Sequence, residues 1–297
     1  MSEPPDPAEQ TSCHARTEIR IVDLHKSFGD KHVLNGVDLN IYAGDTVAIV
    51  GGSGCGKTVL LDHVLGQLRP DRGYVAVVDH DDPRQPLRRL DEIGELEIEH
   101  IHRHWGVVFQ RNALFSGSVY DNIALWLKES LQLDDAAIAG IARRVLAGVG
   151  LRDDDAFLAT DQHELSGGMA KRVAIARALA MAPMVLFYDE PTTGLDPTSA
   201  AHMHELIHAT HNELLPAGGE RTTIIVTHDK DLLTRLRPRT VMLHEGRVFF
   251  DGPFDEFAAN ASPIVRPYFE LMPVLNHVHV HVHGHGHGHG HGHGMPN

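Results

Sequence analysis

The feature that most constrains this chain is the run Gly51-Gly52-Ser53-Gly54-Cys55-Gly56-Lys57-Thr58. An apolar run, Thr46 to Val50, precedes it, and a helical pattern with Leu60, Leu61, Val64, Leu65 and Leu68 on one side follows it. The pattern G-x-x-x-x-G-K-[ST] in a strand-loop-helix context lets backbone N–H groups and a helix N-terminus converge on a polyphosphate. We therefore predict a phosphate-binding loop here. The alternative is a glycine-rich turn with an incidental lysine.

Within this loop the residue types are expected to have separate tasks. Lys57 would reach the β and γ phosphates of a nucleotide, and Thr58 would ligate Mg²⁺. The four glycines would let the backbone curl closely around the anion, because they have no Cβ. Ser53 and Cys55 complete the set of nucleotide-binding residues. We interpret Cys55 as a small residue that fits the loop, with a thiol switch as the alternative.

Length and composition indicate the class of protein. A chain of 297 residues with 42% hydrophobic content can form one large α/β domain with tails. It has no uninterrupted apolar run of about 18 residues, and its start, MSEPPDPAEQ, does not resemble a signal peptide, so we expect a cytoplasmic location. Its two cysteines, Cys13 and Cys55, suit a reducing compartment. The net charge of −14 argues against nucleic acid as the main partner.

A second apolar run, Met184 to Tyr188, ends in the acidic pair Asp189-Glu190. A continuous apolar strand is typical of a parallel sheet that helices cover on both faces. Functional groups in such sheets lie at the carboxyl ends of the strands, so the pair should lie beside the phosphate loop. We expect Asp189 to hold Mg²⁺ through water and Glu190 to polarise the attacking water. The alternative is two surface acids at a strand end.

Three further side chains give weaker signals. Gln110 follows the apolar residues Val107 to Phe109 and could touch Mg²⁺ or the attacking water. His228 follows the apolar strand Thr222 to Thr227 and could contact the γ-phosphate; alternatively it is a histidine satisfied in the core. Phe28 should lie between strands at Glu18 to Leu24 and Val37 to Ile41, which we expect Gly29, Asp30 and an Asn35-Gly36 turn to join. Phe28 could stack on adenine or plug the hairpin.

The run Glu164-Leu165-Ser166-Gly167-Gly168-Met169 directly precedes an amphipathic helical pattern over Lys171 to Met181. It is a second glycine-bearing helix N-terminus, which suits an anion. One chain with two such sites could use the second to cap the γ-phosphate that the loop of another copy binds.

Histidine is concentrated in two places. His100, His102 and His104 alternate, as on one face of a strand, and we interpret them as a solvated face rather than a metal site. Nine histidines alternate with Val and then Gly between His277 and Gly294. Such a tail cannot pack a core, but its imidazoles could bind Zn²⁺, Ni²⁺ or Cu²⁺. The alternative is a solvated tail with incidental affinity.

Taken in order, these motifs resemble those of the ATP-binding subunit of an ABC transporter over residues 18–260. The resemblance implies a P-loop NTPase with a RecA-like core, an antiparallel β subdomain, and an α-helical subdomain at about 111–165 that carries the signature. Residues 1–17 would be a disordered leader, 261–276 a C-terminal extension and 277–297 a disordered tail. Two copies would hold two ATP molecules between them, each phosphate loop facing the Ser166 and Gly168 of the other copy, with Asp196 communicating across the interface.

One departure refines this resemblance, because the fifth signature residue is Met169 where the family usually has Gln. With residues 109–115, 119–122 and 191–197, this is similar to the ATPases of Mla/Mce-type phospholipid transporters. The similarity implies ATP-driven lipid transport at the bacterial inner membrane with an MlaE-like permease, an MCE-domain protein and a STAS-domain subunit. Two alternatives stay open: an importer ATPase for a metal or an amino acid, and a nucleotide switch without a permease. Neither histidine-rich stretch belongs to the family's pattern.

Overall fold

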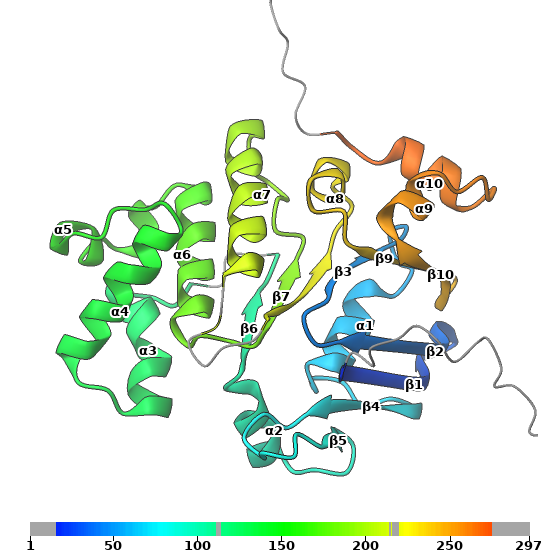
Figure 1. Cartoon of the computed structure of the whole chain (residues 1–297), viewed down its shortest axis with the longest axis horizontal. Helices are drawn as coiled ribbons and strands as arrows, with labels where there is room; N and C mark the ends of the chain where they lie inside the picture. Colours follow the sequence, from blue (N-terminus) through cyan, green and yellow to red (C-terminus); the bar gives the residue numbers. More distant parts are fainter. Residues whose placement is uncertain (1–15, 111–113, 214, 216–219, 275–297) are drawn as a thin grey trace, which may run out of the picture.

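The computed structural model describes residues 16–110, 114–213, 215 and 220–274, and in this part of the chain two sheets are flanked by helices (Figure 1). The predicted α/β class is confirmed. The predicted leader, except for its last two residues, and the histidine tail lie outside the described residues. Thr17, which we assigned to the leader, already begins the first strand.

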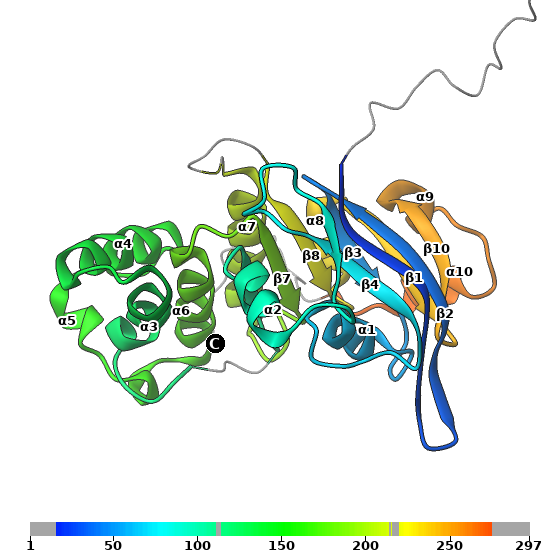
Figure 2. The same cartoon turned by 90° about the horizontal axis from the view of Figure 1, so that it is seen from below.

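The smaller sheet is antiparallel, with strand order β2-β1-β4-β5. Its strands are β1 (Thr17–Phe28), β2 (Lys31–Tyr42), β4 (Arg72–Val78) and β5 (Leu87–Arg89). Gly29 and Asp30 form the turn of the β1–β2 hairpin, which extends beyond the rest of the molecule in Figure 2. The predicted Asn35-Gly36 turn is wrong, because both residues lie inside β2, where Gly36 takes a φ of 84° at a register shift.

The larger sheet has the order β10-β9-β3-β8-β7-β6. Its strands are β3 (Thr46–Val50), β6 (Trp105–Val108), β7 (Val185–Asp189), β8 (Thr222–Val226), β9 (Arg239–His244) and β10 (Arg247–Pro253). All neighbouring pairs are parallel except β9 and β10. Asp189 pairs with Val226, and Val226 with Ile49, so β3, β7 and β8 end at one edge of the sheet. The phosphate loop, Glu190 and His228 follow these three strands and therefore meet there.

The helix after the phosphate loop, α1 (Lys57–Val64), lies between the two sheets (Figures 1 and 2). Its buried Leu60 and Leu61 belong to one hydrophobic core with residues of β1, β2 and β4 on one side and of β3, β7 and β8 on the other. Burying a leucine side chain contributes roughly 1.5–3 kcal/mol. The core therefore anchors the start of α1, and with it the phosphate loop.

The other face of the larger sheet is covered by α6 (Gly167–Ala180), α7 (Pro197–Asn212) and α8 (Lys230–Leu236). The helices α3 (Val119–Leu131), α4 (Asp135–Gly148) and α5 (Asp155–Leu158) pack on α6 or on one another, farther from the sheet. We call α3, α4, α5 and α6 the helical lobe, which stands to the left in Figures 1 and 2. Strand β7 alternates between the two cores: Phe187 faces α1, and Tyr188 faces the helices. The short C-terminal helices α9 (Phe254–Ala258) and α10 (Val265–Leu271) pack near β3 and β9.

The histidine run is not a strand, and that prediction is wrong. Residues Glu95–His102 form helix α2, and His104 lies two residues beyond its end. His100 and His104 both contact Asp81, at 2.6 and 3.0 Å. His102 packs instead on Trp105, with ring centroids 4.7 Å apart. The sequence signal for a helix was the placement of glutamates in the first turn and histidines in the last, which suits the helix dipole.

Candidate functional site

The phosphate loop has the backbone that its glycines predict at three of four positions. Gly51, Gly54 and Gly56 take φ values of 148°, 75° and 106°. A Cβ at Gly51 would lie 2.4 Å from the Leu243 carbonyl oxygen, and one at Gly56 would lie 2.8 Å from Leu34. Gly52 differs, because its φ is not positive and a Cβ there would meet open space. The protein's own packing therefore requires glycine at 51 and 56, and the backbone conformation favours it at 54.

Lys57 opens α1, and its ammonium lies inside the loop, donating hydrogen bonds to the carbonyl oxygens of Gly51 at 2.7 Å and Gly52 at 3.3 Å. Thr58 is exposed in the first turn of the same helix. The Lys57 ammonium therefore lies within a backbone cradle whose N–H groups can bind an anion, and the exposed Thr58 follows it in the same helical turn. The residues present fit a nucleotide: Lys57 can exchange its two carbonyls for phosphate oxygens, and Thr58 carries a hydroxyl suited to Mg²⁺.

Asp189 ends β7 with only 9% of its surface exposed. Burial raises the pKa of Asp189, the neighbouring Glu190 carboxylate raises it further, and the Lys171 and Lys57 ammonium groups oppose the shift. A buried carboxylate with too little positive charge around it suits a cation, because a divalent ion would compensate its desolvation. Asp189 is thus suited to the role that we predicted for it, as a Mg²⁺ ligand alongside Thr58 and Gln110.

Glu190 takes a left-handed backbone conformation with φ at 47°. Such a conformation is uncommon for a residue with a side chain and persists where the surroundings impose it. Its N–H donates to the Val226 carbonyl at 2.8 Å, and its Oε2 lies 2.7 Å from His228 Nδ1. The structure thus brings together Glu190 and His228, which the sequence separates by 38 positions. Since 49% of the His228 side chain is exposed, its interpretation as a core histidine is wrong.

The residue after His228, Asp229, forms a buried pair with His204. Asp229 accepts a hydrogen bond at 2.8 Å from His204 of α7, and both side chains are 5% exposed or less. Asp229 also caps α8 through the N–H groups of Asp231 and Leu232. Burial works to raise the pKa of Asp229, but the hydrogen bonds from His204 and the backbone outweigh it and hold that pKa below its usual value. Sequence reasoning missed this pair, since α7 and α8 meet only in the fold.

The other predicted residues of the nucleotide site lie at its edges. Gln110 is exposed two residues beyond the end of β6. Phe28 is the last residue of β1, with 49% of its surface exposed and the Lys26 ammonium 5.6 Å from the ring centroid. Because its ring is half exposed, Phe28 does not plug the hairpin. The ring is available for stacking.

Ser166 and Gly168 lie at the start of α6. Ser166 is exposed and caps its own helix by accepting a hydrogen bond from the Met169 N–H at 3.3 Å. Met169 packs partly buried against the core of the helical lobe, which explains how an apolar residue fits the fifth signature position. A Cβ at Gly168 would lie 3.2 Å from Ser199, whose hydroxyl donates to Asp196 at 2.6 Å. The structure therefore brings the signature and Asp196 together in one chain.

A groove of about 680 Å³ is lined by residues of α3 and α6 from the helical lobe and of α2 and β6 from the body of the molecule. Its lining includes Trp105, Phe109, Phe115, Trp126, Arg177 and Met181. Phe115 and Trp126 are 45% and 50% exposed, which is unusual for large apolar side chains outside a binding surface. Because Phe109 lines the groove and Gln110 follows it directly, the groove adjoins the nucleotide site.

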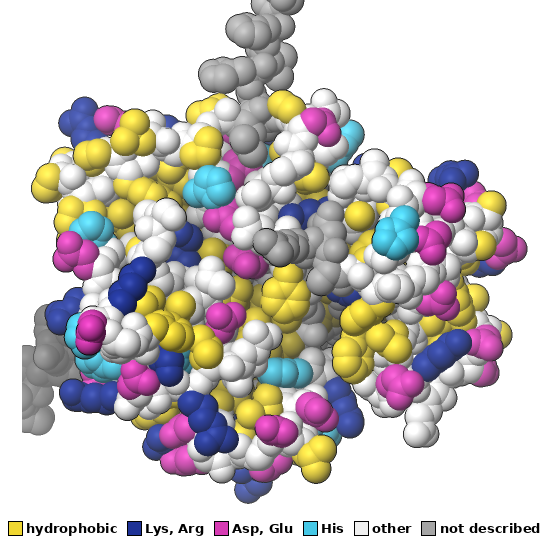
Figure 3. Space-filling view, turned by 180° about the vertical axis from the view of Figure 1, so that it is seen from behind, with side chains coloured by type: hydrophobic (Ala, Val, Ile, Leu, Met, Phe, Trp, Pro, Cys, Tyr) yellow, Lys and Arg dark blue, Asp and Glu magenta, His cyan; other side chains and the backbone are white. Residues whose placement is uncertain are grey.

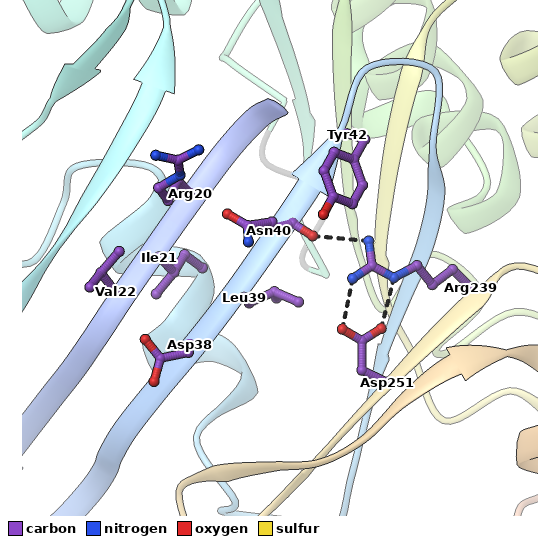
Figure 4. A pocket seen from close by; sticks show the side chains of 9 residues that line it. All are labelled: Arg20, Ile21, Val22, Asp38, Leu39, Asn40, Tyr42, Arg239 and Asp251. Carbon is purple, nitrogen blue, oxygen red and sulfur yellow. Dashed lines mark hydrogen bonds and ion pairs between the residues drawn. The ribbon is translucent and has the colours of Figure 1, made fainter. Parts of the chain in front are cut away.

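A second, more polar pocket of about 340 Å³ lies where β1 and β2 meet β9 and β10 (Figure 4). Its Arg239 makes two 2.7 Å hydrogen bonds to Asp251 and one of 2.9 Å to the Asn40 carbonyl. A guanidinium that is already paired in this way joins the two sheets and has little charge left for a ligand.

On the face shown in Figure 3, basic and acidic side chains are interspersed.

This fold and this arrangement of motifs define an ABC-type ATPase, and the family comparison agrees. The sequence profile of the ABC transporter family matches residues 34–193, and the chain belongs to that family. It is an ATPase of the P-loop class, and domains of this family bind ATP with Mg²⁺. Among the described residues, no group of three or more His, Cys, Asp and Glu side chains forms a resident metal site, and no helix could cross a bilayer.

Several characterised relatives are similar to the chain over most of its length. It is 36% identical over 258 residues to "Protein TRIGALACTOSYLDIACYLGLYCEROL 3, chloroplastic" of Arabidopsis thaliana, covering 83% of this chain and 71% of that protein. It is 33% identical to "Intermembrane phospholipid transport system ATP-binding protein MlaF" of Haemophilus influenzae, covering 80% and 84%. It is also 31% identical to "Methionine import ATP-binding protein MetN" of Clostridium tetani, covering 86% and 74%. The chain spans 66% of the mycobacterial protein named as a probable ribonucleotide transport ATP-binding protein, mkl.

Solved structures lead to the same class. The ATPase cbiO1 of Clostridium perfringens, part of an ABC transporter complex, superposes with a TM-score of 0.68 at 30% identity, covering 82% of this chain and 92% of that one. A cassette named MJ0796, described as dimeric and bound to ADP and phosphate, gives 0.67 at 27% identity and covers 80% and 98%. The predicted P-loop NTPase fold, with its antiparallel and helical parts, is confirmed.

Proposed function

We propose that the chain is the ATP-hydrolysing subunit of a transporter that moves phospholipids at the bacterial inner membrane. The observation that carries the hydrolytic part is the Glu190 carboxylate, held 2.7 Å from His228 beside Asp189 and the phosphate loop. The lipid part is supported by the resemblance to Mla/Mce-type ATPases and by a relative whose name refers to intermembrane phospholipid transport. The importer named for methionine keeps an amino-acid substrate as the second candidate.

The chemistry in this proposal is positioning and charge neutralisation. Lys57 and the loop N–H groups would hold the β and γ phosphates, and Thr58, Gln110 and Asp189 would hold Mg²⁺, which neutralises phosphate charge when bound. Glu190 would accept a hydrogen bond from the attacking water and orient it. His228, anchored on Glu190, would sense the γ-phosphate. Phe28 would stack on the adenine.

The second half of each site would come from another copy of the chain. Ser166 and Gly168 lie in the helical lobe, on α6, whereas the phosphate loop precedes α1 in the body of the molecule (Figures 1 and 2). A homodimer would place Ser166 and Gly168 of one copy on the γ-phosphate held by the other. Asp196, next to Gly168 through Ser199, would link the two sites.

A membrane permease of the MlaE-like kind would complete the assembly, with the ATPase on its cytoplasmic side. We propose that a helix of this permease fills the groove beside Phe109, where Trp126 supplies an exposed aromatic anchor. An MCE-domain protein and a STAS-domain subunit would be further partners. The transition-metal hypothesis for residues 277–294 concerns residues outside the described part of the chain and depends on their sequence alone.

The decisive test is affinity purification of the chain from its own membranes in mild detergent. We expect an MlaE-like permease and an MCE-domain protein to come with it, and the purified complex to move fluorescent phospholipid between vesicles only with hydrolysable ATP. Trp126→Asp should lose the permease, while the control Leu131→Asp, an exposed leucine of the same helix outside the groove lining, should keep it. Recovery of an amino-acid or metal permease would contradict phospholipid as the substrate and favour an importer. A chain that purifies as a dimer alone would favour the nucleotide switch.

A further inference from the structure

Lys171 is a buried lysine that the mechanism above does not use. It is the fifth residue of α6 and only 1% exposed. A lysine is almost never fully buried unless its ammonium has partners, because removing the charge from water is costly. Burial lowers the pKa of Lys171, and the nearby carboxylates of Asp189 and Glu190 act in the opposite direction. A side chain kept at this cost needs a structural or functional explanation.

The partners of its ammonium are two backbone carbonyls from the nucleotide site. The Lys171 Nζ donates to the carbonyl oxygen of Gln110 at 3.0 Å and to that of Glu190 at 3.3 Å. These two residues are 80 positions apart in the sequence and lie after different strands, β6 and β7. Lys171 is thus a single link between the two residues that we place on Mg²⁺ and on the attacking water.

The conformation of Glu190 makes this link consequential. With φ at 47°, its backbone is in a region that a residue with a side chain seldom adopts and that the surroundings must impose. The N–H of Glu190 is held by Val226, and its carbonyl is held by Lys171. A hydrogen bond from a charged donor is roughly twice as strong as one between neutral groups. Lys171 therefore helps to hold the peptide that aims the Glu190 carboxylate.

The position of Lys171 on α6 adds a mechanical connection. Ser166 caps the start of this helix, Lys171 lies about one turn further along, and the helix packs on β6. In Figure 1, α6 stands at the side of the helical lobe that faces the sheet. Because a helix is rigid over this length, a displacement of the signature end also displaces the ammonium that holds Gln110 and Glu190.

We infer that Lys171 is a positioning residue for ATP hydrolysis, which holds the backbones of Gln110 and Glu190 in their reactive places from the signature helix. The inference rests on the ATPase activity of the class and not on phospholipid as the cargo. Lys171 touches neither the phosphate loop nor Lys57, so it acts on turnover and leaves the binding of ATP to the loop.

The test compares kcat and KM for ATP in Lys171→Met and in a matched control, Arg172→Met. Arg172 is the next residue of the same helix and also donates to a carbonyl, that of Gly150 at 3.3 Å, but away from the nucleotide site. We expect Lys171→Met to lower kcat about ten- to hundredfold with KM within about twofold, since small misplacements of reacting groups have effects of this size. Lys171→Arg, which keeps a charged donor, should recover part of the loss, and Arg172→Met should stay within about twofold of the parent kcat.

Three results would overturn the inference: a folded Lys171→Met with kcat near that of the parent, an equal loss in Arg172→Met, or a loss confined to KM. If Lys171→Met does not fold, hydrogen–deuterium exchange of Lys171→Gln decides. We expect faster exchange in peptides covering 105–110 and 188–193 and unchanged exchange over 51–58, whereas unchanged exchange in all three contradicts the inference. If the parent chain hydrolyses no ATP, alone or with its permease, the ATPase mechanism fails, while the exchange measurement still tests Lys171.

Discussion

The candidate nucleotide site has two parts. We call the phosphate loop with Asp189, Glu190 and His228 the core half, and Ser166 with Gly168 at the start of α6 the signature half. The two halves differ in how many of their contacts a single chain completes. In the core half, Asp189 is 9% exposed and Glu190 is held by Val226 and His228, all at one edge of the larger sheet. In the signature half, Ser166 is exposed and its side chain serves only as a cap for its own helix among the contacts observed. The core half is therefore ordered within a single chain, whereas the signature half, in the dimer that we propose, would complete its contacts on the nucleotide that the other copy holds.

This difference explains why the two halves carry different chemistry. Carboxylates and a lysine must be fixed before ATP arrives, because their charges need compensation inside the protein. A helix N-terminus with small residues needs no such compensation and can close onto an anion that another molecule brings. Lys171 connects the halves, since it belongs to the signature helix and contacts the core half.

The largest effect should come from the core half. We expect Glu190→Gln to lower ATP turnover by about 10²–10³-fold, because it removes the carboxylate that orients the water and leaves the shape of the site intact. Binding of ATP should remain, measured with a fluorescent ATP analogue, since the phosphate loop is unchanged. Near-normal hydrolysis by this variant would remove Glu190 from its role.

Substitutions in the signature half should act on the ATP-dependent association of two copies of the chain. In a Glu190→Gln background, ATP should produce a dimer detectable by analytical ultracentrifugation, and Ser166→Arg should weaken it at least about tenfold by crowding the γ-phosphate position. Ser118→Arg is the matched control, because Ser118 caps α3 in the same lobe by accepting from the Asp121 N–H at 3.1 Å. Equal dimerisation of both variants would argue against a shared site.

A smaller effect is expected from replacing Asp189, which should stabilise the folded chain while it impairs the binding of Mg²⁺ with ATP. The pKa of Asp189 is raised above 3.8 by burial, so its ionised form destabilises the folded chain as pH rises through the shifted value. Asp189→Asn should therefore raise Tm in the absence of nucleotide at pH 7–8, and the difference should shrink as pH falls through the raised pKa of Asp189, because the carboxyl then becomes protonated. The same variant should lose the extra thermal stabilisation that Mg²⁺ with ATP gives the parent chain. A lower Tm at pH 8 would contradict this account of Asp189.

The smallest effect should follow removal of residues 277–294, which belong to neither half. We expect ATP turnover to stay within about twofold, while binding of Zn²⁺ or Ni²⁺, measured by calorimetry at pH 7.5, falls. At pH 5.5 the parent chain should also bind less metal, because protonated imidazole is not a ligand. Unchanged metal stoichiometry after the deletion would refute metal binding by the tail.

Parts of the site could be read from local sequence because short, continuous segments build them. The phosphate loop, the Asp189-Glu190 pair and the signature each combine a strand or helix with the residues directly beside it, so spacing alone indicates their backbone. The prediction failed where the local pattern suited two structures. The alternation of His100 and His102 fits a strand face, whereas the glutamates before them suit the first turn of a helix. The segment Glu95–His102 forms helix α2, which packs against β6.

The sequence by itself determined the class of this protein and the strand, loop and helix contexts of the phosphate loop and of the Asp189-Glu190 pair, because these depend on interactions between near neighbours. Only the tertiary structure decided the left-handed Glu190, its contact with His228, the His204–Asp229 pair and the reach of Lys171 to Gln110 and Glu190. The conformation of Glu190 is held by Val226, and the other three features are themselves contacts between segments far apart in the chain. Such contacts form only when burial of the two cores brings the elements together, and no spacing rule in one sequence records them.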